Sequence, residues 1–171
     1  KRDYKLYGSC HGTGTSQSRS LAVYKGISEA IERWAWEVSL NNPHHLETLR
    51  LDCDPSTTGF AAFPGIRVSS ARSKAFSEAV ERYAIANWWE GKLSHEVLNL
   101  QIEDACNGIK IDTPWTNRKC VVLWANTNAF TAYGFGCSAH LQESIFSAKV
   151  ELTRNISVLK HYYGGNLETP D

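Results

Sequence analysis

Methionine is absent from the 171-residue sequence, which begins at Lys1. At a usual frequency of about 2%, a chain of this length would carry about three or four methionines. The missing initiator residue leads us to expect a fragment, a processed product or a trimmed form of a longer protein.

Three further absences narrow the class of protein. No run of 18 apolar residues occurs, which excludes a membrane-spanning helix. No basic segment followed by an apolar one opens the sequence, so no secretory signal is recognised. The 18 Lys and Arg balance the 18 Asp and Glu, and the basic surface typical of nucleic-acid binding is not expected. We therefore expect a cytoplasmic protein that binds neither nucleic acid nor a membrane.

The cysteine and histidine patterns give no metal motif. The sequence has five cysteines but no CxxC, the spacing used by zinc ribbons and thioredoxin-like oxidoreductases. We expect the cysteines to be reduced and mostly buried. His44 and His45 follow Asn-Asn-Pro, a context that predicts a loop with two solvated histidines.

Apolar residues at steps of three and four predict long helices, and a weaker pattern predicts a short one. The long helices are expected around 21–38, 76–89 and 141–159, and the short one over 94–106. Ser69-Ser70 is suited to cap the second long helix, and Gly164-Gly165 to end the last one.

Apolar or alternating runs predict four strands, over 4–9, 60–68, 119–125 and 130–135. The last two are expected to form a hairpin through Asn126-Thr127-Asn128. Strands and helices follow one another irregularly, which favours a mixed α/β or α+β fold with helices packed on a mixed or largely antiparallel sheet.

The most informative feature is an internal repeat. The segment Ser-Glu-Ala-Ile-Glu-Arg-Trp-Ala at 28–35 matches Ser-Glu-Ala-Val-Glu-Arg-Tyr-Ala at 77–84, with six identities in eight positions. On a helix, two glutamates three residues apart lie one turn apart, so each helix can direct two carboxylates to one point. Carboxylate oxygens are the ligands that Mg²⁺ prefers, usually together with phosphate. The alternative is that each Glu forms a solvated ion pair with a nearby Arg on the same helix.

These segments resemble the YcaO family. The glycine turn Gly12-Thr13-Gly14 and the helix at 28–33 resemble the family's first ExxER block. Thr58-Gly59-Phe60-Ala61-Ala62 and the helix at 77–82 resemble its NGxAxG segment and second ExxER block. Gly134-Phe135-Gly136 with Glu151 is similar to its late QxxxE helix. On this basis we expect residues 1–171 to form a single YcaO-like domain, and an incomplete one.

The resemblance implies an ATP-binding fold whose glutamates hold Mg²⁺ on the triphosphate while a peptide backbone amide is O-phosphorylated, which leads to an azoline or a thioamide. It assigns the metal role to Glu29, Glu32, Glu78, Glu81 and Glu151. Nucleotide contacts would come from Arg82, and from Thr58 and Ser147 at positions where the family has Asn and Gln. No catalytic residue is assigned. Gly26 replaces a further family serine.

The resemblance also implies partners. These are a peptide or protein substrate and a partner protein that delivers the substrate or sulfur, and a homodimer is a candidate assembly. Two alternatives stay open at the level of sequence. One is a degenerate YcaO-like scaffold or regulatory subunit that binds a peptide or partner without catalysis, and the other is an unrelated α/β binding domain.

Overall fold

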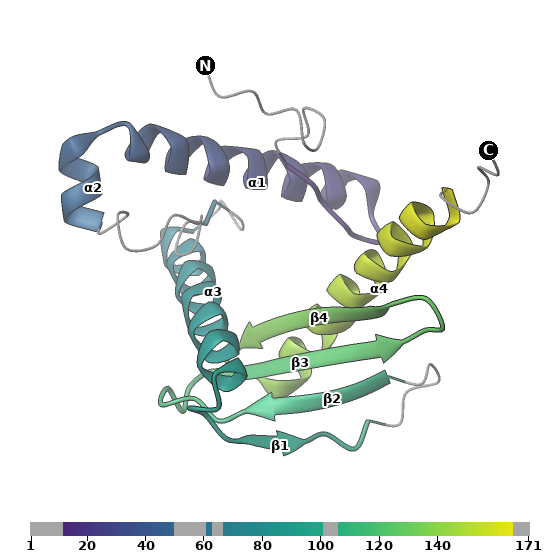
Figure 1. Ribbon diagram of the computed structural model, residues 1–171. Helices are drawn as coiled ribbons and strands as arrows, with labels where there is room; N and C mark the ends of the chain where they lie inside the picture. Colours follow the sequence, from purple (N-terminus) through teal and green to yellow (C-terminus); the bar gives the residue numbers. More distant parts are fainter. Residues whose placement is uncertain (1–11, 50–60, 63–66, 101–105, 166–171) are drawn as a thin grey trace. The chain divides into compact units, whose positions relative to one another are not determined.

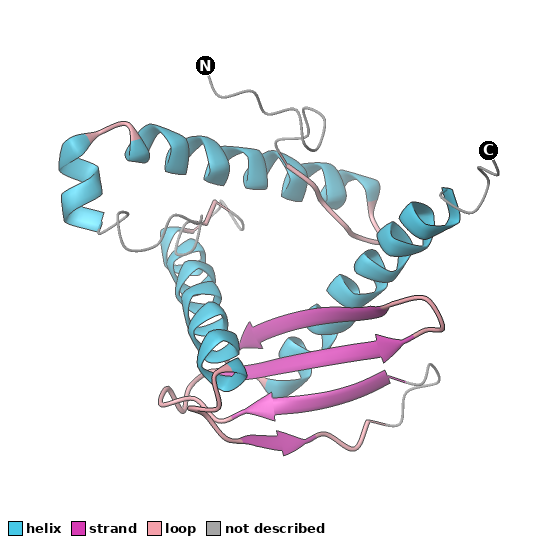
Figure 2. Cartoon of the chain, in the orientation of Figure 1, coloured by secondary structure: helices cyan, strands magenta, loops and turns pink. Residues whose placement is uncertain are grey.

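The computed structural model describes residues 12–49, 61–62, 67–100 and 106–165 (Figure 1). These residues form a mixed α+β fold of four helices and one four-stranded antiparallel sheet (Figure 2). The helices are α1 (Arg19–Leu40), α2 (Pro43–Leu49), α3 (Val68–Trp89) and α4 (Leu141–Gly165). The strands are β1 (His95–Val97), β2 (Cys106–Ile111), β3 (Lys119–Asn126) and β4 (Thr131–Ser138).

The chain divides into two compact units, Lys1–Phe76 and Ser77–Asp171. The first contains α1, α2 and the start of α3, and the second contains the rest of α3, the sheet and α4. The three predicted long helices and the predicted hairpin are confirmed as α1, α3, α4 and the pair β3–β4.

The prediction of a loop at His44 and His45 is wrong, because both residues lie in α2. Pro43 occupies the first position of this helix, where a missing N–H costs nothing. The Asn42 side-chain oxygen accepts hydrogen bonds from the backbone N–H groups of His44, at 3.0 Å, and His45, at 3.4 Å. Proline therefore starts a helix here instead of only ending one.

The prediction of a short helix over 94–106 is also wrong. Residues 95–97 form β1 and Cys106 begins β2, which pairs along its whole length with β3. Strand pairing with distant residues outweighs the weak local helical pattern. The predicted strand at 4–9 lies outside the described residues, as does most of 60–68, whose last residue, Val68, begins α3.

The sheet has the order β1-β2-β3-β4 and separates two apolar clusters in the second unit. On one face, Val122 and Cys120 of β3 pack with Val80 and Ala84 of α3. On the other face, neighbouring residues of β3 pack against α4, which runs behind the sheet in Figure 1. Alternation of side chains along a strand buried on both faces explains the continuous apolar run of β3.

Helix α4 lies unusually close to β4, and two glycines permit this. A Cβ atom at Gly134 would stand 2.1 Å from the Ala148 carbonyl oxygen and 2.5 Å from the Leu152 nitrogen. A Cβ atom at Gly136 would stand 2.2 Å from the Ser144 carbonyl oxygen. Only a residue without a side chain fits between the backbones of strand and helix at these two positions.

This contact predicts that Gly134→Ala lowers the free energy of unfolding by about 3 kcal/mol, since backbone atoms on both sides must move apart. Gly108→Ala is the matched control. Its Cβ atom would meet the side-chain ends of Leu123 at 2.6 Å and Leu100 at 2.8 Å, which can turn away. We expect a loss of about 1 kcal/mol there. Urea unfolding of both variants measures the difference, and equal losses would contradict the close approach.

Candidate functional site

The repeated ExxER segments adopt the same local structure in the two units. Both are helical, in α1 and α3, and the serines that begin them, Ser28 and Ser77, are buried. Ser28 donates a hydrogen bond from its hydroxyl to the Tyr24 carbonyl oxygen at 2.9 Å, within the preceding helical turn. The glutamates that follow these serines, Glu29 and Glu78, are partly exposed, and each pairs with the arginine four residues later.

Glu29 links α1 to the Gly12–Gly14 segment. Its Oε2 atom accepts hydrogen bonds from the Thr13 backbone N–H and, at 2.8 Å, from the Thr13 hydroxyl. Its Oε1 atom forms an ion pair with Arg33 at 2.6 Å. One oxygen is therefore fixed by the backbone of the preceding segment, and the other is occupied by an arginine one turn along the helix.

The Gly12–Gly14 segment lies directly on α1. A Cβ atom at Gly12 would stand 2.0 Å from the Gly26 carbonyl oxygen, and one at Gly14 would stand 1.9 Å from the Ala22 carbonyl oxygen. A Cβ atom at Gly26, where the resembling family has a serine, would stand 3.5 Å from the Gly14 nitrogen, an ordinary van der Waals contact. The close approach therefore depends on Gly12 and Gly14 and not on Gly26.

Glu32 reaches the segment that precedes α3. Its Oε1 atom accepts a hydrogen bond from the Ala62 backbone N–H at 2.7 Å. Both residues belong to the first unit. The first ExxER helix therefore uses its two glutamates to hold two different backbone segments, one before each ExxER helix.

Glu151 repeats the arrangement of Glu29 in the second unit. Its Oε2 atom accepts a hydrogen bond from the Phe135 backbone N–H at 2.8 Å, and its Oε1 atom lies 3.3 Å from Arg154. Glu29 and Glu151 each bind an N–H sixteen residues earlier, between two glycines. One turn after Glu151, Asn155 donates a hydrogen bond to the Tyr133 carbonyl oxygen at 2.8 Å. Glu151 and Asn155 thereby satisfy backbone groups on the open edge of β4.

Glu78 and Glu81 lie on the part of α3 that belongs to the second unit. Glu78 pairs loosely with Arg82, at 3.9 Å, and the Arg82 side chain is 62% exposed. Glu81 contributes to the electrostatic environment of Cys120 on β3. Glu81 is therefore close enough to the sheet to influence Cys120, whereas Arg82 is exposed to solvent.

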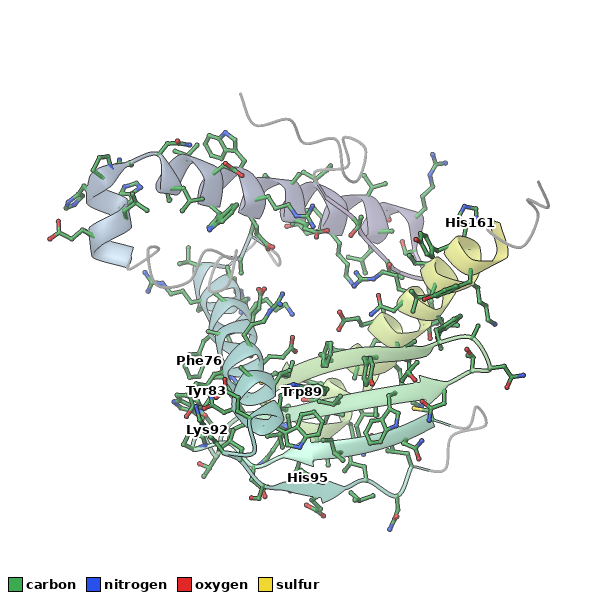
Figure 3. All side chains as sticks on the ribbon, viewed as in Figure 1. Phe76, Tyr83, Trp89, Lys92, His95 and His161 are labelled. Atoms are coloured by element: carbon green, nitrogen blue, oxygen red, sulfur yellow. The ribbon has the colours of Figure 1, made fainter. Side chains whose placement is uncertain are left out.

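The same end of α3 carries an aromatic group that packs beside the sheet. Tyr83 contacts Trp115 edge-on, with ring centroids 5.0 Å apart, and Trp88 contacts His95 at 6.0 Å. Trp88 also donates a hydrogen bond to His95 Nδ1 at 3.2 Å. Figure 3 labels Tyr83 on α3 and His95 on β1. These aromatics serve packing, while the adjacent Trp89 is 77% exposed.

The remaining predicted site residues have different outcomes. Ser147 is exposed on α4, and Thr58 lies outside the described residues. Within each unit, no three His, Cys, Asp or Glu of the described residues lie close enough together to hold a metal ion. The expected convergence of Glu29 or Glu32 with Glu78 or Glu81 joins residues of different units and stays a prediction.

The repeated motif predicts which glutamates matter, but it does not predict their backbone partners Thr13, Ala62 and Phe135. The signal was the pair of G-x-G segments, Gly12–Gly14 and Gly134–Gly136, each at the same distance before a glutamate. Aligned with each other, they would have predicted that Thr13 and Phe135 are equivalent. Ala62 lies the same sixteen positions before Glu78, although its N–H binds Glu32.

Comparison with known proteins gives no relatives. No family model, no curated protein and no solved structure matches the chain. Among the described residues, no helix is long and apolar enough to cross a membrane.

The geometry predicts different effects for two substitutions of Glu151. Glu151→Ala removes the acceptor of the Phe135 N–H and should lower the free energy of unfolding by about 1–2 kcal/mol, a value reduced for partial exposure. Glu151→Gln keeps an oxygen acceptor and loses only the Arg154 ion pair, so we expect a loss of about 0.5 kcal/mol. Urea unfolding in the absence of ligands measures both. Equal losses would show that the charge, and not the backbone hydrogen bond, supports the edge of β4.

Proposed function

We propose that this chain is a YcaO-like domain that binds ATP with Mg²⁺ and activates a backbone amide of a peptide or protein by O-phosphorylation. The observation that carries the proposal is the fixed placement of Glu29, Glu32 and Glu151. Each has a carboxylate oxygen hydrogen-bonded to a backbone N–H of a segment outside its own helix. Carboxylates held in this way are positioned before a ligand arrives, which suits binding and phosphoryl transfer.

The residues fit Mg²⁺ in donor type. Glu29 and Glu32 in the first unit, and Glu78, Glu81 and Glu151 in the second, each carry the carboxylate oxygens that this cation takes together with phosphate oxygens. Mg²⁺ would neutralise the charge that develops on the transferred phosphoryl group. The chain's own part is to hold Glu29 and Glu151 through the Thr13 and Phe135 amides, and to supply Arg82, which is exposed enough to approach a phosphate.

Arginines already occupy some of the carboxylate oxygens that Mg²⁺ would take, so Mg²⁺ binding requires these ion pairs to open. Arg33 and Arg154 each pair with the Oε1 atom of a partly exposed glutamate. Such pairs contribute little stability, so exchange of the arginine for a cation costs about 1 kcal/mol or less. An arginine released from its carboxylate would then be free to pair with the triphosphate.

A second candidate function is a YcaO-like scaffold or regulatory subunit that binds a peptide or partner without catalysis. The observation that favours it is that the glutamates already have protein partners. In that case Glu29 and Glu151 would hold the G-x-G segments in place and bind nothing else. Arginine pairs that stay closed in the presence of nucleotide would be the expected behaviour of such a scaffold.

Calorimetric titration with ATP, with and without Mg²⁺, separates the two functions. We expect binding that depends on Mg²⁺ in the wild-type chain and a loss of at least about tenfold in affinity in Glu29→Gln/Glu78→Gln. Glu90→Gln is the matched control, because Glu90 forms an exposed pair with Lys92 near the end of α3. It should bind as the wild type does. Equal binding with and without Mg²⁺, or no binding, would reject the enzyme in favour of the scaffold.

A further inference from the structure

Two cysteines face each other across the β3–β4 hairpin. Cys120 and Cys137 are direct partners in the register of the two strands. Their Sγ atoms lie 3.0 Å apart, with the Cys120 thiol donating to the Cys137 sulfur. Both are free thiols. The two sulfur atoms would have to move about 1 Å closer to reach the S–S bond length of about 2.04 Å.

The backbone at this position suits a disulfide. Phe135 donates its N–H to Glu151, so its backbone groups point away from β3. Backbone directions alternate along an antiparallel strand, and Cys137, two residues later, therefore also points away from β3. Cys120 and Cys137 consequently form a non-hydrogen-bonded pair, for which the Cα atoms lie about 4.5 Å apart. This separation falls within the range of about 4.4–6.8 Å found in disulfides.

The surroundings make the pair slow to react. Cys120 is 1% exposed and Cys137 is 8% exposed, between the sheet and Val80 and Ala84 of α3. The hydrogen bond with Cys137 and burial raise the pKa of the Cys120 thiol, with a smaller contribution from the charge of Glu81. Cysteines that sense peroxide rapidly are accessible and largely in the thiolate form. These two thiols are buried, and the pKa of Cys120 is raised, so we expect slow oxidation.

We propose that Cys120 and Cys137 are a modification site at which a disulfide-containing oxidant of the glutathione type forms a cross-strand disulfide. The more exposed Cys137 loses its proton and attacks one sulfur of glutathione disulfide, which releases one glutathione. Cys120 then loses its proton and attacks the Cys137 sulfur of the mixed disulfide, which releases the second glutathione. The two thiols are oxidised by two electrons and the glutathione disulfide is reduced. This site does not depend on the proposed function.

The bond would strengthen the junction where α4 begins. Lys119, beside Cys120, accepts a hydrogen bond through its carbonyl oxygen from the Ser144 hydroxyl of α4 at 2.6 Å. Cys137 lies at the end of β4 that leads into the same helix. A disulfide between residues seventeen positions apart restricts the unfolded chain. We expect it to raise the melting temperature by about 10 °C.

The test equilibrates the full chain in mixtures of reduced and oxidised glutathione, followed by acid quenching, intact mass measurement and peptide mapping. A parallel sample refolds from urea in the same mixtures, so burial cannot block the reaction. With equimolar reduced and oxidised glutathione, we expect the intact mass to fall by two hydrogens. Peptide mapping should locate the bond between Cys120 and Cys137, and the melting temperature should rise. Cys106→Ala, the matched control on β2, should keep this bond.

In Cys120→Ala and in Cys137→Ala, the disulfide-linked peptide pair should be absent. Oxidation should then no longer raise the melting temperature. The wild-type map decides the question even if these variants fold poorly. If the refolded wild-type chain keeps both thiols reduced in the most oxidising mixture, or pairs them with other cysteines, the proposal is wrong.

Discussion

The close approach of a glycine-containing segment to a helix is the constraint on which both units depend. In each unit a G-x-G segment lies so near the helix backbone that a Cβ atom would meet carbonyl oxygens. The N–H between the glycines then reaches a glutamate on that helix, Glu29 in one unit and Glu151 in the other. Without the glycines the segment would move outward, and the glutamate would lose the partner that fixes its position.

This constraint gives the proposed metal-binding residue Glu151 a packing role. Glu151, together with Asn155, covers the open edge of β4, which would otherwise present unpaired backbone groups. The same hydrogen bond holds one carboxylate oxygen still while the other faces Arg154.

The sequence allowed prediction of features with a strong local pattern. Helices α1 and α4 and the β3–β4 hairpin have such patterns, and they were predicted correctly, as was α3, whose apolar periodicity is much weaker. Strand β2 was missed because Asn107, Gly108 and Lys110 weaken its apolar run, and only pairing with β3 makes it a strand. The partners of Glu29 and Glu151 lie sixteen residues away, beyond any helical or strand period. They depend on contacts between backbones, which periodicity does not describe.

Amide hydrogen exchange, followed residue by residue by NMR, tests most directly whether Glu29 and Glu151 hold the two G-x-G segments. The Thr13 and Phe135 amides should exchange slowly, although neither N–H takes part in sheet or helix pairing. In Glu29→Ala and Glu151→Ala, respectively, the exchange of that one amide should accelerate more than that of its neighbours. If both amides exchange at the rate of solvent-exposed positions in the wild-type chain, Glu29 and Glu151 do not hold the two G-x-G segments in place.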